Sequence, residues 1–167
     1  MLKAGVLTIS DKGSQGQRQD LSGPAASNFI AENLNIEVSK YEIVPDEREI
    51  ISSRLKEWVD RDGLDLIVTS GGTGLSPRDI TPEATQDVID RIIPGIAETM
   101  RSETRQKAPT SVLSRAIAGS RGKCLIINLP GSPKGVLECL EIIGTVIPHA
   151  LDILSGVAFE GPHYKGG

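Results

Sequence analysis

Three short aliphatic segments constrain the fold of this chain more than any other feature of its 167-residue sequence. They are KAGVLTIS at 3–10, LDLIVTS at 64–70 and KCLIINL at 123–129. Each is bounded by turn-forming or charged residues and lacks a regular alternation of apolar and polar positions, which is typical of strands buried on both faces. Such strands belong to parallel sheets that are covered by helices on both sides. The chain is therefore expected to build its layers around a parallel sheet.

Segments whose apolar residues recur at helical spacing separate these strands. A further strand is expected over 37–44, where EVSKYEIV alternates. Residues 11–20 are expected to form a mobile loop, and Ser22 is expected to cap the helix that follows it. The expected helices cover about 22–34, 47–61, 81–92, 96–106, 110–118 and 134–154. This order of elements predicts a three-layer α/β/α fold with a mostly parallel central sheet.

The length of the chain suits a single domain, which we place at 1–158, with a flexible C-terminal tail at 159–167. Apolar residues make up 38% and charged residues 24% of the chain, as in ordinary soluble globular proteins. The formal net charge of −4 argues against nucleic acid or an anionic membrane as a partner. No apolar run approaches the ~20 residues that a membrane helix needs. Cys124 and Cys139 lie in apolar segments, as buried structural thiols do, so we expect a cytoplasmic protein.

The four connections from a strand to the next helix share an unusual composition. They are SDKGS at 10–14, VPDE at 44–47, SGGTGLSPRD at 70–79 and LPGSPKG at 129–135. Surface turns favour the same residue types, so no single loop is decisive. In a parallel sheet, however, all four loops follow the carboxyl ends of strands, where α/β proteins bind their ligands. Their shared placement predicts one cleft.

The loop at 70–79 has the composition of a phosphate-binding loop. Gly71, Gly72 and Gly74 allow the backbone to approach a ligand closely and to point N–H groups at an anion. The helix expected from Thr81 adds the positive end of its dipole. The loop has neither a P-loop lysine nor a G-x-G-x-x-G pattern, and a plain tight turn is the alternative interpretation.

Asp11, Asp46 and Asp79 each follow a predicted strand. Carboxylates beside a phosphate site repel the phosphate unless a cation lies between them, so this combination indicates Mg²⁺ together with nucleotide phosphates. A turn or helix-capping role is the alternative for each aspartate taken alone. Lys134 is either a phosphate contact or an exposed turn lysine.

The sequence offers no covalent catalyst. His149 lies on an apolar helical segment and His163 in the predicted tail, and no Ser-His-Asp or Cys-His set is visible.

The same loops carry a resemblance to a known family. SGGTG followed by SPRDITPEAT, with LPGSPKG later, resembles the molybdopterin adenylyltransferase family. That family includes the bacterial Mog and MoaB proteins, the plant Cnx G domain and the gephyrin G domain. The resemblance extends through LTISDKGSQGQRQDLSGP, VPDEREII, PGIAETMR and VLSRAIAG, and so covers about residues 3–155.

The resemblance implies an enzyme of molybdenum cofactor biosynthesis. Family members join the terminal phosphate of molybdopterin to the AMP part of ATP, with Mg²⁺, and release pyrophosphate. Carried over, Asp46 and Asp79 are the expected catalytic and metal-binding residues, and Ser114 and Arg115 the expected pterin-binding ones. Arg115 is alternatively a structural ion-pair partner. The residues expected to bind nucleotide or phosphate are Ser10, Asp11, Ser70, Gly71, Gly72, Thr73, Gly74, Gly131, Ser132 and Lys134.

Three other interpretations compete with this one. A MoaB-type protein that only binds pterin or nucleotide is disfavoured because the chain keeps both Asp46 and Asp79, and a scaffold module would need an attached partner domain. A Rossmann dehydrogenase is excluded because SDKGSQGQRQD does not fit its glycine fingerprint. The resemblance further suggests a homo-oligomer, either a trimer or a hexamer, with molybdopterin synthase and molybdenum-insertion proteins as partners. The sequence does not distinguish a molybdenum pathway from a tungsten pathway.

Overall fold

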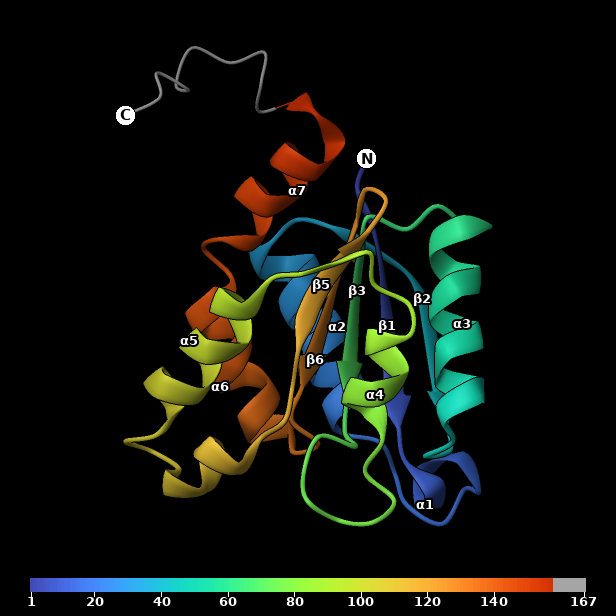
Figure 1. Ribbon diagram of the computed structural model, residues 1–167, viewed down its shortest axis with the longest axis vertical. Coiled ribbons are helices and arrows are strands. Elements are labelled where there is room, and N and C mark those ends of the chain that lie inside the picture. The colour runs from blue at the N-terminus through green and yellow to red at the C-terminus, as the bar shows by residue number, and fades with distance from the viewer. Residues whose placement is uncertain (158–167) are drawn as a thin grey trace.

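The computed structural model describes residues 1–157, and the tail predicted at 159–167 lies outside the described residues. A six-stranded sheet in the order β2-β1-β3-β6-β5-β4 forms the centre of the domain (Figure 1). The strands are β1 Lys3–Ile9, β2 Glu37–Val44, β3 Leu66–Ser70, β4 Arg91–Ile92, β5 Ala118–Arg121 and β6 Cys124–Leu129. The helices are α1 Asp11–Ser14, α2 Ser22–Asn33, α3 Arg48–Asp60, α4 Thr81–Gln86, α5 Pro94–Thr104, the 3₁₀ helix η1 Pro109–Leu113, α6 Pro133–Ile143 and α7 Ile147–Ser155.

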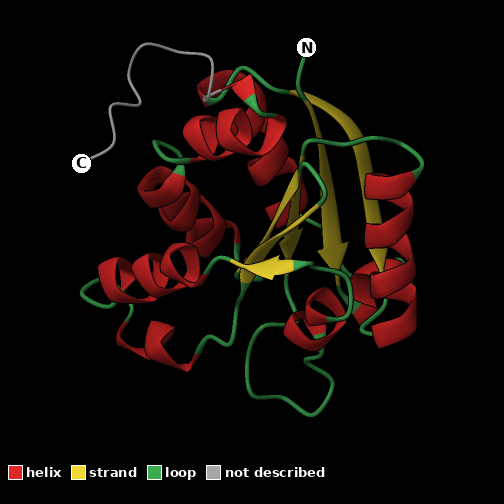
Figure 2. Cartoon of the chain, turned by 45° about the horizontal axis from the view of Figure 1, so that its top comes forward, coloured by secondary structure: helices red, strands yellow, loops and turns green. Residues whose placement is uncertain are grey.

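Helices cover both faces of the sheet (Figure 2). Successive strand residues point to opposite faces, so Val6 packs with the first core cluster while Leu7 packs with the second. The first cluster is completed by apolar side chains of α2, α5, α6 and α7, and the second by those of α3 and α4. The predicted three-layer α/β/α fold with a mostly parallel sheet is confirmed, since β2, β1, β3 and β6 pair in parallel.

The antiparallel edge of the sheet was not predicted. The prediction of a helix over 110–118 is wrong, because this segment contains η1 and then leads into β5. A tight turn at Gly122 connects β5 to β6, and the two strands pair antiparallel. Gly122 has a φ of 53°, which suits the first position of such a hairpin turn. Gly119 lets β4 approach closely, because a Cβ there would lie 2.5 Å from the carbonyl oxygen of Arg91. Both short strands depend on these long-range contacts rather than on local propensity.

Other boundaries also differ from the prediction. The helix expected over 134–154 is divided into α6 and α7, and Pro148, which lacks an N–H group, lies at the start of α7. The helix expected over 81–92 ends at Gln86. The loop expected at 11–20 begins with α1, whose N-cap is Ser10. Ser22 is the first residue of α2 rather than its cap, and the carboxylate of Asp20 accepts the N–H of Gly23 instead.

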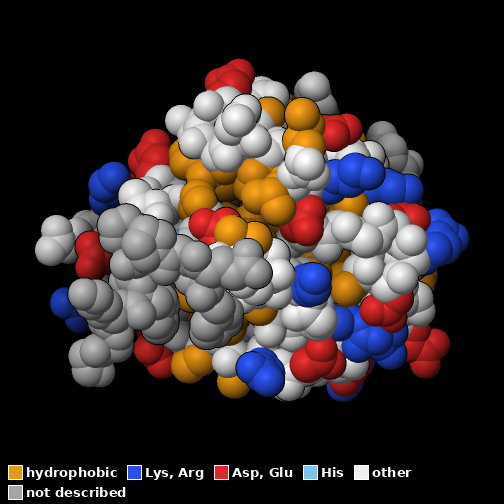
Figure 3. Space-filling model, turned by 90° about the horizontal axis from the view of Figure 1, so that it is seen from above, with side chains coloured by type: hydrophobic (Ala, Val, Ile, Leu, Met, Phe, Trp, Pro, Cys, Tyr) orange, Lys and Arg blue, Asp and Glu red, His pale blue; other side chains and the backbone are white. Residues whose placement is uncertain are grey.

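No helix within residues 1–157 is long and apolar enough to cross a membrane. The sheet edge that carries the amino ends of the parallel strands is seen from above in Figure 3. Outside the grey residues, apolar side chains gather in the upper middle of this view, and acidic and basic side chains are both present around them.

A buried amide ties the centre of the sheet to α4. Asn128 of β6 is fully buried, and its Nδ2 donates to Thr69 Oγ1 at 3.0 Å and to Thr85 Oγ1 at 2.9 Å. Its Oδ1 accepts the backbone N–H of Ile117 at 3.2 Å. A single side chain thereby joins β6 to β3, to α4 and to the segment that enters β5.

We expect Asn128→Ala to lower the free energy of unfolding by about 2–3 kcal/mol, because it leaves a buried N–H and two buried hydroxyls without this partner. Thr69→Val removes one acceptor with little change of shape and is expected to cost about 1 kcal/mol. Urea unfolding of both variants measures the difference. Equal losses for the two variants would contradict a central role for Asn128.

Candidate active site

The four predicted loops lie together at the lower edge of the sheet in Figure 1, beyond the carboxyl ends of β1, β2, β3 and β6. Hydrogen bonds tie the loops in pairs. The N–H of Ser10 donates to Val44 O at 2.9 Å, and the N–H of Gly71 donates to Leu129 O at 3.2 Å. Ser70 Oγ lies 2.9 Å from Pro130 O. The predicted cleft is therefore assembled from segments far apart in the sequence.

The loop at 70–79, here called the glycine loop, requires glycine at positions 71 and 72. Gly71 and Gly72 have φ angles of 98° and 67°, in the left-handed region that favours glycine. A Cβ on Gly71 would lie 2.4 Å from Ile9 O, and one on Gly72 would lie 2.2 Å from Thr81 Oγ1. The main chain here thus packs directly against β1 and the start of α4.

The amides of this loop fall into two groups. The N–H of Gly71 donates to Leu129 O, whereas those of Gly72, Thr73 and Gly74 donate to no backbone carbonyl among residues 1–157. Donors of this kind suit an anionic ligand. Gly71 therefore shapes the loop, and the following three residues carry the available amides.

The three predicted aspartates come together at this edge. Asp11 and Asp46 are joined reciprocally: the N–H of Asp11 donates to Asp46 Oδ2 at 2.9 Å, and the N–H of Asp46 donates to Asp11 Oδ1 at 3.0 Å. Burial raises the pKa of Asp46 above its ordinary value, and the charges of Asp11 and Asp79 also raise it. Asp79 Oδ2 accepts the N–H of Ser76 at 3.0 Å. The result is a partly buried carboxylate whose nearest acidic neighbours disfavour its charge.

Such a carboxylate fits a divalent cation. Asp46 and Asp79 offer hard oxygen donors, the type that Mg²⁺ prefers, and Mg²⁺ commonly takes one or two protein carboxylates with the remainder from phosphates and water. Residues 1–157 contain no cluster of three or more His, Cys, Asp or Glu side chains arranged as a metal site. The two carboxylates match the protein's share of such a Mg²⁺ site.

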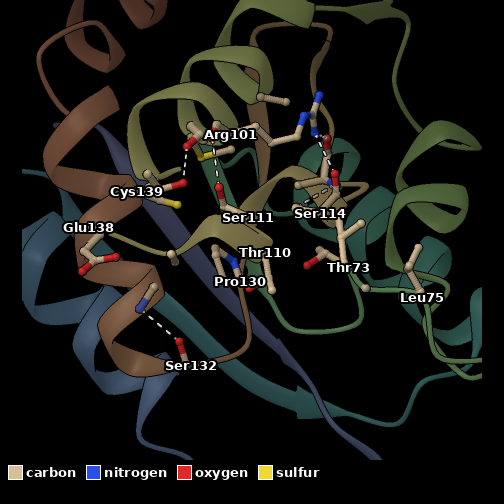
Figure 4. Close-up of a pocket in the computed structure, with 18 residues that line it drawn as sticks. Thr73, Leu75, Arg101, Thr110, Ser111, Ser114, Pro130, Ser132, Glu138 and Cys139 are labelled. Atoms are coloured by element: carbon tan, nitrogen blue, oxygen red, sulfur yellow. Dashed lines mark hydrogen bonds between the residues drawn. The ribbon is translucent and has the colours of Figure 1, made fainter. Parts of the chain in front are cut away.

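Two cavities flank the glycine loop. The first, of about 620 Å³, is lined by Ser10, Asp46, Asp79 and residues 70–72, together with Asp20 and other residues of the segment before α2. The second, of about 450 Å³, lies between the loop and α5, η1 and α6 (Figure 4). Ser132 borders both cavities. The residues that line the second cavity include Thr73, Gly74, Ala97, Met100, Arg101, Ser111, Leu113, Ser114 and Cys139.

The remaining predicted residues take different places. Ser114 lines the second cavity. Arg115 binds within the chain: its Nε donates to Gly74 O at 2.8 Å, its Nη2 donates to Asp79 O at 2.9 Å, and its Nη1 pairs with Glu83. These contacts support the structural alternative for Arg115. Lys134 is among the residues of neither cavity, and its side chain is 84% exposed.

Asp20 is a site residue that the sequence reading missed. Asp20 lines the first cavity, and its carboxylate accepts hydrogen bonds from Thr8 Oγ1 at 2.6 Å, Tyr41 OH at 2.6 Å, Ser22 Oγ at 3.0 Å and Gly23 N at 3.1 Å. Burial raises the pKa of Asp20, but these hydrogen bonds outweigh it and hold the pKa below its ordinary value. The signal in the sequence was the spacing of Asp20 before Ser22 and Gly23, an arrangement typical of a helix start.

The sequence matches a known family and several of its members. The family model described as "Probable molybdopterin binding domain" matches residues 5–149. A molybdopterin adenylyltransferase of Helicobacter pylori is 48% identical over 153 residues, which is 91% of this chain and 87% of that protein. The molybdopterin adenylyltransferase of Escherichia coli is 39% identical over 174 residues, covering 98% and 88%.

A solved structure gives the same result. The crystal structure of the molybdopterin biosynthesis enzyme MoaB from Thermus thermophilus superposes with a TM-score of 0.88 at 52% identity, covering 93% of this chain and 98% of that one. The chain belongs to the family of molybdopterin-binding domains. Relatives that are 39–48% identical over most of the chain are molybdopterin adenylyltransferases, which confirms the family and the class of enzyme predicted from the sequence.

Proposed function

We propose that the protein catalyses the Mg²⁺-dependent adenylylation of molybdopterin by ATP, a step of molybdenum cofactor biosynthesis. In this reaction a terminal phosphate oxygen of molybdopterin attacks the α-phosphorus of ATP. The bond from the α-phosphorus to the oxygen that bridges it to the β-phosphorus breaks, and pyrophosphate leaves. The observation that carries the proposal is that Asp46 and Asp79 line the first cavity beside the glycine loop. This loop also borders the second cavity.

The protein has little covalent work to do in such a transfer. The nucleophile is already an ionised phosphate, so no histidine, cysteine or lysine base is needed, and positioning with charge stabilisation supplies most of the catalysis. When bound, Mg²⁺ supplies the positive charge that neutralises the phosphates. Asp46 and Asp79 would hold it, and the backbone N–H groups of Gly72, Thr73 and Gly74 would donate hydrogen bonds to phosphate oxygens.

The two cavities suit the two substrates. We assign the nucleotide to the first cavity, where Ser10, Ser70, Gly131 and Ser132 surround the acidic pair. We assign the pterin to the second, which combines apolar walls from α5 with hydroxyl and guanidinium groups of Ser114, Ser111 and Arg101. A pterin needs both kinds of contact, because it is a flat heterocycle with hydrogen-bonding edges. Assembly as a homo-oligomer and a cytoplasmic location stay predictions.

The test is a product assay with labelled ATP. Purified protein, molybdopterin, Mg²⁺ and ATP carrying a radioactive α-phosphate are expected to yield labelled adenylylated pterin, while a γ-phosphate label is expected in pyrophosphate. Removal of Mg²⁺ with a chelator is expected to stop both. Absence of labelled pterin, or a label that appears only in free AMP, would refute the proposed reaction.

A further inference from the structure

One guanidinium joins three of the four loops at the carboxyl edge of the sheet. Arg78 lies in the segment between β3 and α4, next to Asp79. Its Nε donates to Asp11 Oδ2 at 3.0 Å and its Nη2 donates to Asp11 Oδ1 at 2.9 Å, which makes a two-point contact with the loop after β1. The same Nη2 donates to Glu47 Oε1 at 2.9 Å in the loop after β2.

The contact with Asp11 continues to Asp46. Asp11 and Asp46 exchange two hydrogen bonds between backbone N–H groups and carboxylate oxygens. Arg78 fixes both oxygens of Asp11, and Asp11 in turn fixes the backbone and one carboxylate oxygen of Asp46. Arg78 is among the residues of neither cavity. It is therefore connected to the candidate catalytic carboxylate without facing the substrates.

The charges at this edge explain why such a connection is needed. Asp11, Asp46, Glu47 and Asp79 bring four carboxylates to the edge, and like charges at close range repel each other. Within residues 1–157, Arg78 is the one cationic side chain in ion-pair contact with Asp11 and Glu47. Its two-point contact with the Asp11 carboxylate leaves Asp11 Oδ1 aligned to accept the N–H of Asp46 as well.

The contribution of this cluster to overall stability is expected to be small. The side chain of Arg78 is 55% exposed, and those of Asp11 and Glu47 are 34% and 51% exposed. Ion pairs with that much exposure add little to the stability of a fold. A planar guanidinium with two donors aimed at one carboxylate supplies orientation rather than stability, and a lysine cannot reproduce that geometry.

We propose that Arg78 is a positioning residue for the adenylyl transfer, acting through Asp11 on Asp46. The proposal rests on the proposed function for its effect on turnover, while the mechanical link itself is independent of the reaction. Loss of a partner that orients a metal-binding carboxylate typically costs about 10–100-fold in metal affinity or activity. Because Arg78 does not face the substrates, the loss is expected in kcat, with KM for ATP and for molybdopterin changed less than about 3-fold.

The decisive variant is Arg78→Lys, which keeps the charge and removes the two-point geometry. We expect a loss of about 10-fold or more in kcat and a Tm within about 2 °C of the wild type. Arg48→Lys is the matched control: Arg48 makes a similar two-point contact with Asp87 at 2.7 Å for both bonds, is 52% exposed, and is not connected to Asp46. It is expected to turn over like the wild type.

A second measurement needs no substrate. Hydrogen exchange of the ligand-free protein, followed by NMR, reports the backbone amides of Asp11 and Asp46, both of which donate to carboxylate oxygens. In Arg78→Lys these two amides are expected to exchange about 10-fold faster or more, whereas amides in the centre of β3 keep their rates.

The outcomes separate this proposal from the proposed function. Normal kcat in Arg78→Lys, unchanged exchange at Asp46, or a rise in KM for ATP at constant kcat would each overturn the positioning role. A wild type without turnover would refute the proposed function, and the exchange rates would still decide whether Arg78 holds Asp46. Faster exchange with a selective loss of kcat supports the proposal.

Discussion

Asp79→Asn is expected to lower kcat for adenylylated molybdopterin by about 10²–10³-fold, the loss seen when one electrostatic stabiliser of a transition state is removed. The substitution keeps the shape of the side chain and deletes the negative charge that would hold the cation. Asp79 Oδ2 accepts the N–H of Ser76, and an amide oxygen can still do so, which preserves the loop. Molybdopterin binding is expected to change little, because Asp79 lines the first cavity and not the second.

Steady-state kinetics with Mg²⁺–ATP and fluorescence titration with molybdopterin measure the two effects separately. Asp152→Asn, on the exposed side of α7, is the matched control for loss of an aspartate charge. It is expected to behave like the wild type. Normal turnover of Asp79→Asn would show that this carboxylate does not hold the metal, and a large loss of pterin affinity would contradict the division between the two cavities.

Gly71→Ala is expected to lower the free energy of unfolding by about 2–4 kcal/mol, and the variant is expected to lose most of its activity. A Cβ at this position would lie 2.4 Å from the carbonyl oxygen of Ile9, and the backbone φ of 98° is strained for alanine. Because the obstacle is the backbone of β1 and not a flexible side chain, relief requires the whole glycine loop to move. The amides of Gly72 and Thr73 would move with it.

Gly131→Ala is the control for this substitution. It lies in the neighbouring loop, its φ is not in the left-handed region, and its Cβ would meet nothing nearer than Gly71 Cα at 3.4 Å. Its stability is expected to stay within about 1 kcal/mol of the wild type. Chemical denaturation compares the two variants, and the product assay tests Gly71→Ala. Similar stabilities for Gly71→Ala and Gly131→Ala would contradict the close packing of the loop on β1.

The parts of the fold that the sequence predicts are those fixed by local composition. The segments at 64–70 and 123–129 are aliphatic without alternation, and this pattern is enough to indicate buried parallel strands. The parallel arrangement then implies that the loops at 44–47 and 70–79 meet at one edge, as they do. The convergence of Asp46 and Asp79 on one cavity follows from the topology.

The parts that escaped prediction depend on contacts between distant residues. β5 has the sequence AGSR, which has weak strand propensity and becomes a strand by pairing with β6. The sequence places Asp20 in a polar loop, and only the fold brings Thr8 and Tyr41 to its carboxylate. Arg78 likewise precedes a predicted metal ligand, but the distance from it to Asp11 in the chain hides their pairing.

The partition between the two cavities is built largely from main chain, since the glycines at 71, 72 and 74 contribute no side chains to it. The walls on either side come from separate parts of the sequence: residues 18–22 on one side, and α5 with η1 on the other. Substitutions in one wall therefore leave the other and the partition in place. If the second cavity holds the pterin as proposed, the exposed side chain of Leu113, which lines only that cavity, is a position where the fit of the heterocycle can be changed without altering any residue of the first cavity.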